Sequence, residues 1–274
     1  MTLILTCSTN DYILQAVDRR VTRPDGTVTN DDANKAIFWC RGAAVTYTGP
    51  TTFDGEPTIE WIGKRMSEAR EPHIQKVMMY IAERASKYFR ENKDMVSKFT
   101  IVVGGWAKVA DELQPYLILA SNIMTTAWKW EASPSDRMNL HSDVKPKTST
   151  EVLYVVGQTL KEFEDGSLRA KLNRAVNMGA APYEVARLLG ETIQSVSAGN
   201  DSRAKRVGKG MIIQLVSRKA VESNSLYLIY GLTPDTHSFH YVSADGRTDR
   251  FTGPAIACPG GFISNFGGGS LPRR

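Results

Sequence analysis

Short apolar runs, separated by turn residues, dominate the first fifty residues of the chain. Runs of four to eight such residues between turn signals are typical of β-strands. Thr9-Asn10-Asp11 lies between two of these runs and predicts a hairpin, and the turn at Arg41-Gly42 predicts a second pair of strands that ends at Gly49-Pro50. The four expected strands cover residues 2–9, 12–18, 36–40 and 43–48.

Apolar residues three or four positions apart predict two pairs of helices further along the chain. The clearest stripe lies within 73–90, where Ile74, Val77 and Ile81 fall on one face, and Pro182 suits the first turn of the last helix. The expected helices cover residues 58–68, 73–90, 160–176 and 182–196. Further strands are expected at 99–106, 116–123, 128–130, 151–157, 211–216, 226–230 and 239–242.

The predicted elements follow one another as strands, two helices, strands, two helices and strands. Two packed sheets with helices covering both outer faces satisfy this order, so we predict an α+β fold. The segment 131–150 is rich in Ser, Pro, Asp, Lys and Thr and is expected to form an exposed loop. Because no internal repeat or linker divides the chain, residues 1–274 are expected to form a single domain, with a core at about 2–230 and a C-terminal extension at about 231–274.

The composition is that of an ordinary globular protein, with 42% hydrophobic and 23% charged residues. The net charge is +5, but basic and acidic residues are interspersed, and the one obvious basic cluster, residues 203–206, is short. We interpret that cluster first as a solvated loop and second as an anion site, so nucleic-acid binding ranks last among the functions considered.

The cysteines Cys7, Cys40 and Cys258 are widely spaced and show neither metal-ligand nor redox spacing, which suits a reducing cytoplasm. The amino terminus has no secretory signal, and no apolar run reaches the length of a membrane span. We therefore expect a soluble cytoplasmic protein that has no membrane or nucleic-acid partner and needs no cofactor.

Candidate chemistry is concentrated at the amino terminus, where Thr2 follows Met1. Removal of Met1, expected before a small residue, would give Thr2 both a hydroxyl and a free α-amine. A hydroxyl is a weak nucleophile until a base takes its proton. An α-amine with a pKa of about 7.7–8.0 can be that base near neutral pH. Thr2 could therefore supply nucleophile and base together.

Three further residues could support such a site. Asp18 and Lys35 lie at the edges of strands expected to neighbour the first one. A lysine held charged by an aspartate would lower the pKa of a nearby amine or hydroxyl. Gly49, at the end of the fourth strand, allows close approach of a backbone N–H to a developing oxyanion.

This combination resembles the proteasome β-type family of N-terminal nucleophile hydrolases, which includes the bacterial peptidase HslV and related bacterial homologues. The family pattern is an N-terminal Thr, an Asp-x-Arg-x-Thr motif after a hairpin, a Lys followed by apolar residues, and a strand that ends in Gly. The matching residues are Thr2, Asp18-Arg19-Arg20-Val21-Thr22, Lys35-Ala36-Ile37-Phe38 and Val45-Thr46-Tyr47-Thr48-Gly49. The resemblance implies a four-layer αββα sandwich.

By this resemblance, Thr2 is the nucleophile, Lys35 lowers its pKa, and Asp18 orients Lys35. Gly49 would donate to the oxyanion, Thr22 and Gly49 would hold an extended peptide, and Asp201 would support the amino terminus. The family further implies a self-compartmentalising threonine peptidase that cleaves peptides or unfolded proteins. Such subunits form homo-oligomers, here a double ring of six or seven subunits or a related helical ring, and often work with an ATP-driven unfoldase.

The sequence departs from the family pattern at two supporting positions. Gln158 stands after Gly157 where a serine is expected, and Val207-Gly208-Lys209-Gly210 resembles the family's Ser-Gly-Gly segment without its serine. Asp201 occupies the aspartate position only if the following loop is longer than usual. Phe53 could line the substrate pocket, but we interpret it as a core residue.

Two alternatives to the peptidase remain open. The departures at Gln158 and in 201–210 favour a proteasome-fold ring assembly with weak or no peptidase activity, acting as a scaffold or chamber. Alternatively, the same nucleophile could cleave a small amide or release γ-glutamyl-type groups, although a one-residue leader is unlike the internal self-cleavage that those enzymes usually need.

Overall fold

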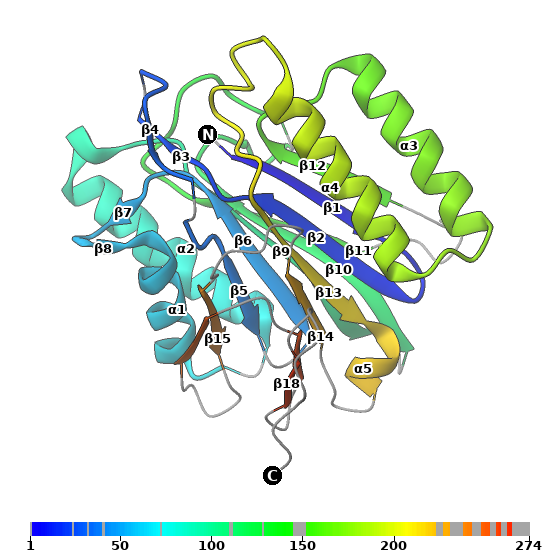
Figure 1. Cartoon of the computed structure of the whole chain (residues 1–274). Coiled ribbons are helices and arrows are strands. Elements are labelled where there is room, and N and C mark those ends of the chain that lie inside the picture. The colour runs from blue at the N-terminus through cyan, green and yellow to red at the C-terminus, as the bar shows by residue number, and fades with distance from the viewer. Residues whose placement is uncertain are drawn as a thin grey trace.

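The structure is a computed structural model. It describes residues 2–23, 25–31, 33–39, 42–71, 73–109, 112–127, 129–144 and 152–222, together with the strands at 227–230, 238–242, 248–252, 256–258 and 262–264. Two large sheets form the centre of the molecule (Figure 1).

The first sheet contains the first two strands of the chain, β1 and β2. Its order is β12-β1-β2-β13-β14, and all neighbours in it are antiparallel. The predicted hairpin forms between β1 and β2 because the Thr9 hydroxyl accepts hydrogen bonds from the N–H groups of Asp11 and Tyr12 and closes the turn. The strands are β12 (Val152–Gly157), β1 (Leu3–Ser8), β2 (Tyr12–Asp18), β13 (Met211–Ser217) and β14 (Tyr227–Tyr230).

The second sheet has the order β11-β10-β9-β6-β5-β15-β16. Its neighbours are antiparallel, except that β15 runs parallel to β5. The strands are β11 (Asn139–Val144), β10 (Glu112–Ser121), β9 (Thr100–Val109), β6 (Ala43–Thr48), β5 (Ala36–Trp39), β15 (Ser238–Val242) and β16 (Thr248–Thr252).

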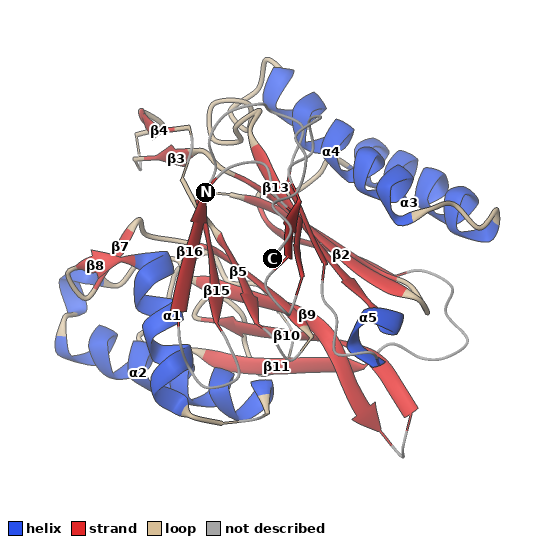
Figure 2. Ribbon diagram, turned by 60° about the horizontal axis from the view of Figure 1, so that its bottom comes forward, coloured by secondary structure: helices blue, strands red, loops and turns tan. Residues whose placement is uncertain are grey.

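Helix pairs cover the two outer faces, so the chain forms the four-layer αββα sandwich (Figure 2). The pair α1 (Thr58–Ala69) and α2 (Ile74–Glu91) packs on the second sheet, and α3 (Glu162–Asn177) and α4 (Pro182–Ala198) pack on the first. Pro182 begins α4 as predicted, and the Glu184 carboxylate accepts the N–H of Ala181.

Burial on both faces explains the continuous apolar runs of the central strands. In β1, Leu3 and Leu5 face the α3–α4 layer, whereas Ile4 faces the space between the sheets. The stripe predicted for 73–90 likewise packs inward, with Val77, Met78 and Ile81 in the core under α1 and α2.

The remaining elements are short. The hairpins β3 (Val21–Thr22) with β4 (Val28–Asn30), β7 (Thr52–Phe53) with β8 (Glu56–Pro57), and β17 (Ile256–Cys258) with β18 (Phe262–Ser264) form separate two-stranded pairs. A 3₁₀ turn, η1 (Lys93–Met95), follows α2, and the short helix α5 (Arg218–Glu222) follows β13.

Two sequence predictions need correction. The loop expected over 131–150 is wrong in part, because β11 lies within it and pairs with residues 116–121 of β10. The strand expected at 128–130 is also wrong: of its described residues, Trp130 makes a single bridge to Met124. The strand expected at 239–242 is present as β15, which together with β16 adds to the second sheet from within the expected C-terminal extension. Most of the C-terminal extension lies outside the described residues.

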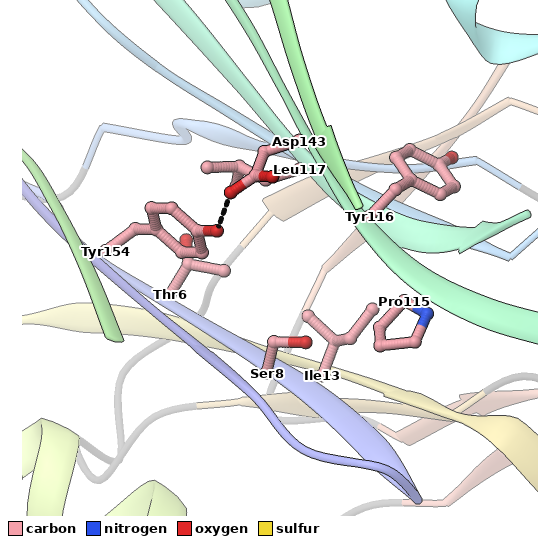
Figure 3. Close-up of a pocket in the computed structure, with 8 residues that line it drawn as sticks. All are labelled: Thr6, Ser8, Ile13, Pro115, Tyr116, Leu117, Asp143 and Tyr154. Carbon is pink, nitrogen blue, oxygen red and sulfur yellow. Dashed lines mark hydrogen bonds between the residues drawn. The ribbon is translucent and has the colours of Figure 1, made fainter. Parts of the chain in front are cut away.

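A small cavity lies between the two sheets, beside β1 and β10 (Figure 3). Its volume is ≈ 10 Å³, which is room for about one water molecule. The hydroxyl of Tyr154 donates to the Asp143 carboxylate at its edge, at 2.5 Å, and so joins β12 to β11. The lining residues are Thr6, Ser8, Ile13, Pro115, Tyr116, Leu117, Asp143 and Tyr154.

Within the part of the chain that the structure describes, no helix combines the length and apolar character needed to cross a membrane.

Candidate active site

Thr2, Asp18 and Lys35 meet where the two sheets are packed together. Thr2 immediately precedes β1 and Asp18 ends β2, so both come from the first sheet. Lys35 immediately precedes β5 of the second sheet. The ends of three strands thus bring together residues that are up to 33 positions apart in the sequence.

The lysine contacts the candidate nucleophile directly. Lys35 Nζ donates to Thr2 Oγ1 at 2.7 Å. The same ammonium donates to the Arg20 carbonyl and lies 3.6 Å from Asp18 Oδ2. Thr2 is 4% exposed, Lys35 3% and Asp18 0%, so water screens these charges little.

Backbone N–H groups hold the Asp18 carboxylate in place. Oδ1 accepts the N–H of Leu3 at 2.7 Å, and Oδ2 accepts those of Arg20 at 3.0 Å and Gly208 at 3.2 Å. Three donors and the neighbouring lysine provide the partners that a buried carboxylate needs. Asp18 is therefore oriented toward Lys35 by the chain on both sides of the hairpin and by the segment before β13.

Burial affects the two charged groups in opposite directions. It lowers the pKa of the Lys35 ammonium, and attraction to Asp18 partly offsets this effect. It raises the pKa of Asp18, against the opposing effects of Lys35 and of the three backbone donors. Burial therefore makes the Lys35 ammonium give up its proton more readily than an exposed lysine does, and Asp18 opposes that loss.

A left-handed glycine allows the chain to pass close to Thr2. Gly157, the last residue of β12, has a φ of +86°, and a Cβ placed there would lie 2.0 Å from the Thr2 carbonyl oxygen. The next residue, Gln158, donates its backbone N–H to that oxygen at 2.8 Å. Gln158 thus supports Thr2 through its main chain, although it lacks the hydroxyl of the expected serine.

Gly49 follows β6 with a φ of +152°, a conformation that favours glycine. A Cβ there would lie 2.7 Å from a ring carbon of Phe99 and 3.0 Å from the Lys98 carbonyl oxygen. Phe53 stacks on Phe99, with ring centroids 5.1 Å apart, and is almost completely buried among aromatic residues. The interpretation of Phe53 as a core residue is confirmed.

Asp201 lies in a separate ion cluster. Its carboxylate is 2.6 Å from Arg203 and 3.0 Å from Lys161, and Arg203 lowers its pKa. Arg203 also binds Glu164 and donates to the Thr159 carbonyl at 3.3 Å. The polar contacts described for Asp201 are thus with Arg203 and Lys161 rather than with Thr2, and through Arg203 the cluster braces the turn that follows β12.

The basic cluster 203–206 is partly used within the fold. Arg203 forms the ion pairs just described, and the Ala204 carbonyl accepts a hydrogen bond from Arg20 at 3.0 Å. Thr22 lies half-buried in β3 and pairs with Val28 of β4. It is therefore placed on a short hairpin beside the Asp18–Arg20 segment.

One contact of Thr2 was not foreseen from the sequence. The Thr2 nitrogen donates to Thr48 Oγ1 at 3.3 Å, and Thr48 is the residue immediately before Gly49. In the sequence, the position of Thr48 next to Gly49, the expected oxyanion donor, could have indicated that Thr48 lies near Thr2. The contacts of Gly157 with Thr2 and of Gly208 with Asp18 were likewise not predicted, because they depend on distances between separate strands.

No protein-family model matches the sequence, and a comparison with curated proteins finds no match. Among solved structures, the chain is similar to Anbu (ancestral beta-subunit) from Yersinia bercovieri, with 9% identity, a TM-score of 0.48 and coverage of 78% of this chain and 81% of that one. It is also similar to eukaryotic HslV from Trypanosoma brucei, with 11% identity, a TM-score of 0.43 and coverage of 79% and 99%.

A third similar structure is an Anbu (Gly-1) mutant from Hyphomicrobium sp. strain MC1, with 10% identity, a TM-score of 0.49 and coverage of 79% and 82%. All three likenesses concern the path of the backbone. A functional proposal for this chain therefore rests on the side chains around Thr2.

Proposed function

We propose that the chain is a subunit of a threonine-type peptidase whose nucleophile is Thr2, exposed by removal of Met1. The contact of 2.7 Å between Lys35 Nζ and Thr2 Oγ1 carries this proposal. A buried ammonium on a hydroxyl oxygen favours the alkoxide over the alcohol, because the negative charge that forms there is stabilised at short range.

The free α-amine of Thr2 serves as the base. It takes the proton of Oγ1, which attacks the carbonyl carbon of a peptide, and the carbonyl oxygen becomes negative. The intermediate then collapses, the C–N bond breaks, and the α-ammonium returns its proton to the leaving amine. An ester on Thr2 remains, and water hydrolyses it with the amine again acting as base.

The Lys35 ammonium keeps the amine ready for this role. A positive charge close to an amine disfavours protonation of the amine and lowers its pKa. Asp18 keeps Lys35 in place, since it is itself held by three backbone donors. Gly49 supplies the N–H for the oxyanion, and substitution there is strained by both φ and contacts with Phe99.

The substrate class follows from the main chain around the site. Thr22 lies two residues after Arg20, whose carbonyl accepts a hydrogen bond from Lys35. Gly49 follows Thr48, which contacts the Thr2 nitrogen. An extended peptide held between these two segments would bind as an added β-strand. We propose that peptides or unfolded segments are cleaved in an inner chamber of a double ring of six or seven subunits or a related helical ring. An ATP-dependent unfoldase is the corresponding partner, and a cytoplasmic location suits this role.

A scaffold without peptidase activity is the second candidate. It is favoured by the replacement of the expected serine by Gln158, which contacts Thr2 through its backbone N–H. Its ring assembly would be the same, but Thr2 would have no chemical role. Reactivity of Thr2 therefore separates the two functions.

Intact mass spectrometry of the purified protein tests the proposal. The protein is measured before and after incubation with a peptide epoxyketone, which bonds the hydroxyl and the α-amine of an N-terminal threonine together. We expect loss of Met1 and one adduct on Thr2, no adduct in Thr2→Ala, and an adduct in Thr2→Ser. Retention of Met1 would contradict the peptidase, and a processed Thr2 that forms no adduct would favour the scaffold.

A further inference from the structure

Thr48 contacts the atom that the proposed mechanism uses as its base. Its Oγ1 accepts a hydrogen bond from the backbone N–H of Thr2 at 3.3 Å, and this nitrogen becomes the free α-amine once Met1 is removed. The mechanism above gives Thr48 no role, since Lys35 serves the hydroxyl and Gly49 serves the oxyanion. Among the residues that the structure describes, Thr48 is the one whose side chain is hydrogen-bonded to the Thr2 nitrogen.

The fold holds the Thr48 side chain firmly. β6 is a central strand that pairs with β5 on one side and with β9 on the other, where Thr48 lies opposite Thr100. Thr48 is buried, and its β-branched side chain has a restricted χ1 angle. Its methyl group lies 3.4 Å from the position that a Cβ of Gly157 would occupy, so both branches are engaged at the amino-terminal site.

A free α-amine needs such a partner. It can rotate about its bond to Cα, and it acts as a base only when its lone pair faces Oγ1. A hydrogen bond from one N–H to a fixed acceptor selects that orientation, whereas a side chain without an acceptor leaves the amine to rotate. The expected serine after Gly157 is absent here, which leaves this task to another residue.

We propose that Thr48 is a positioning residue: its hydroxyl accepts a hydrogen bond from the Thr2 α-amine and turns the amine lone pair toward Thr2 Oγ1. This inference rests on the proposed function. Thr48 acts through Thr2 and does not touch the reacting carbonyl. From β6, Thr48 orients the Thr2 α-amine, a task for which Gln158, the residue after Gly157, has no hydroxyl.

The same contact affects protonation of the amine. An acceptor favours the charged ammonium, so the Thr48 hydroxyl opposes Lys35, which disfavours it. The titratable groups that face the site are Lys35 and Asp18, with Arg19 and Asp31 acting on Lys35. The contributions of β6 and β12, namely Thr48, Gly157 and Gln158, do not titrate. Loss of the hydroxyl therefore lowers the pH at which the amine becomes a base.

Two variants at this position test the inference. Thr48→Val keeps the shape and removes the acceptor, whereas Thr48→Ser keeps the acceptor and removes the methyl group. The rate of peptide epoxyketone addition to Thr2 is measured against pH by intact mass spectrometry. We expect Thr48→Val to react at least about tenfold more slowly, in line with a loss of about 1.4 kcal/mol, with its acid limb at lower pH. Thr48→Ser should recover both the rate and the limb.

A second measurement reads the amine without any turnover. Acetic anhydride labels the Thr2 α-amine in proportion to its neutral fraction, and peptide mass spectrometry follows this labelling against pH. We expect half-maximal labelling of Thr48→Val at lower pH than in the wild type and Thr48→Ser. Identical labelling profiles in all three proteins, or a Thr48→Ser variant that behaves like Thr48→Val, would overturn the inference.

The two measurements also separate the inference from the proposed function. A wild type that forms no epoxyketone adduct but shows a labelling profile that depends on Thr48 would overturn the peptidase and retain the role of Thr48. An adduct that forms equally fast in all three proteins would retain the peptidase and overturn the role of Thr48. Thermal unfolding of each variant shows whether the fold is intact.

Discussion

At the scale of single residues, the site depends on close approach of main-chain atoms. The Thr2 carbonyl passes so close to Gly157 that any side chain there would have to displace it. Asp18 is likewise held by backbone N–H groups from three places in the sequence. The side chains of the candidate site are therefore positioned largely by contacts with the backbone.

Gly157→Ala should abolish reactivity of Thr2 by moving its carbonyl. Gly179→Ala is the matched control, because Gly179 has a similar φ of +72° but nothing within 4 Å of the added Cβ. Both variants should lose about 1 kcal/mol of stability from the left-handed backbone. Epoxyketone addition should fail in Gly157→Ala alone, and equal reactivity of the two variants would contradict the role of Gly157.

The pH dependence of reactivity should follow the protonation of Lys35. Because burial lowers the pKa of Lys35 from 10.5, reactivity should fall at alkaline pH with a midpoint below 10.5. On the acid side, it should rise as the α-amine loses its proton. Lys35→Met should be unreactive, whereas Lys76→Met, at an exposed position, should keep the wild-type profile. An alkaline limb at or above 10.5 would contradict the assignment.

The same shift has a defined effect on stability. Between the lowered pKa of folded Lys35 and its ordinary value of 10.5, the unfolded chain binds more protons than the folded one. The contribution of Lys35 to the free energy of unfolding therefore rises with pH across this window. Urea denaturation at several pH values should therefore show a steeper rise of the unfolding free energy with pH in the wild type than in Lys35→Met.

At the scale of elements, the side chain of Asn122 connects the end of β10 to the loops on either side of it by hydrogen bonds. Asn122, just after β10, accepts the N–H of Phe99 at 2.8 Å and donates to the carbonyls of Ser97 at 2.8 Å and Ser135 at 3.1 Å. Phe99 in turn lies against Gly49. The Asn122 side-chain amide thus links the loops around β9 and β10 to Phe99, which lies against Gly49.

Asn122→Ala should be destabilised by about 2–4 kcal/mol, because one buried and two partly buried hydrogen bonds are lost and their backbone partners are left unpaired. Asn92→Ala is the control: Asn92 is exposed and its amide donates once, to Tyr88, so that change should cost about 0.5 kcal/mol or less. Urea denaturation measures both. A loss in Asn122→Ala no larger than in Asn92→Ala would show that the linkage is unimportant.

At the scale of the whole molecule, the site exists only because the two sheets are packed together. Thr2 and Asp18 lie at strand ends of the first sheet, and Lys35, Thr48 and Gly49 lie at strand ends of the second. Side-chain hydrogen bonds cross the same interface elsewhere: Gln214 donates to the Ile37 carbonyl at 2.7 Å and Trp106 to that of Val216 at 3.1 Å. These bonds fix how the sheets lie relative to each other.

Tyr154→Phe tests one bond across this interface. It removes the donor to Asp143 beside the small cavity (Figure 3) and should lower the free energy of unfolding by about 1 kcal/mol. Tyr183→Phe changes a tyrosine that is exposed on α4 and should have almost no effect. Thermal unfolding compares them, and equal melting temperatures would show that the Tyr154 bond adds nothing to the sheet interface.

The sequence was most informative where local patterns decide structure. The hairpin at Thr9–Asp11 and the stripes of α2 and α4 were predicted because turn chemistry and helical periodicity are local. β11 was missed because its polar composition resembles a loop, and it forms a strand only by pairing with β10 at the edge of the second sheet. Asp201 was expected to support the amino terminus from its motif, yet the polar partners described for it are Arg203 and Lys161.

The sequence by itself determined the kinds of layers and the identity of the central trio. Thr2, Asp18 and Lys35 could be named because each stands at the end of a recognisable strand. Only the tertiary structure decided that Thr48 contacts the Thr2 nitrogen and that Gly157 and Gly208 approach the same site. The reason is physical: strand periodicity is a property of neighbouring residues, whereas a contact of about 3 Å between strands depends on the register and packing of both sheets.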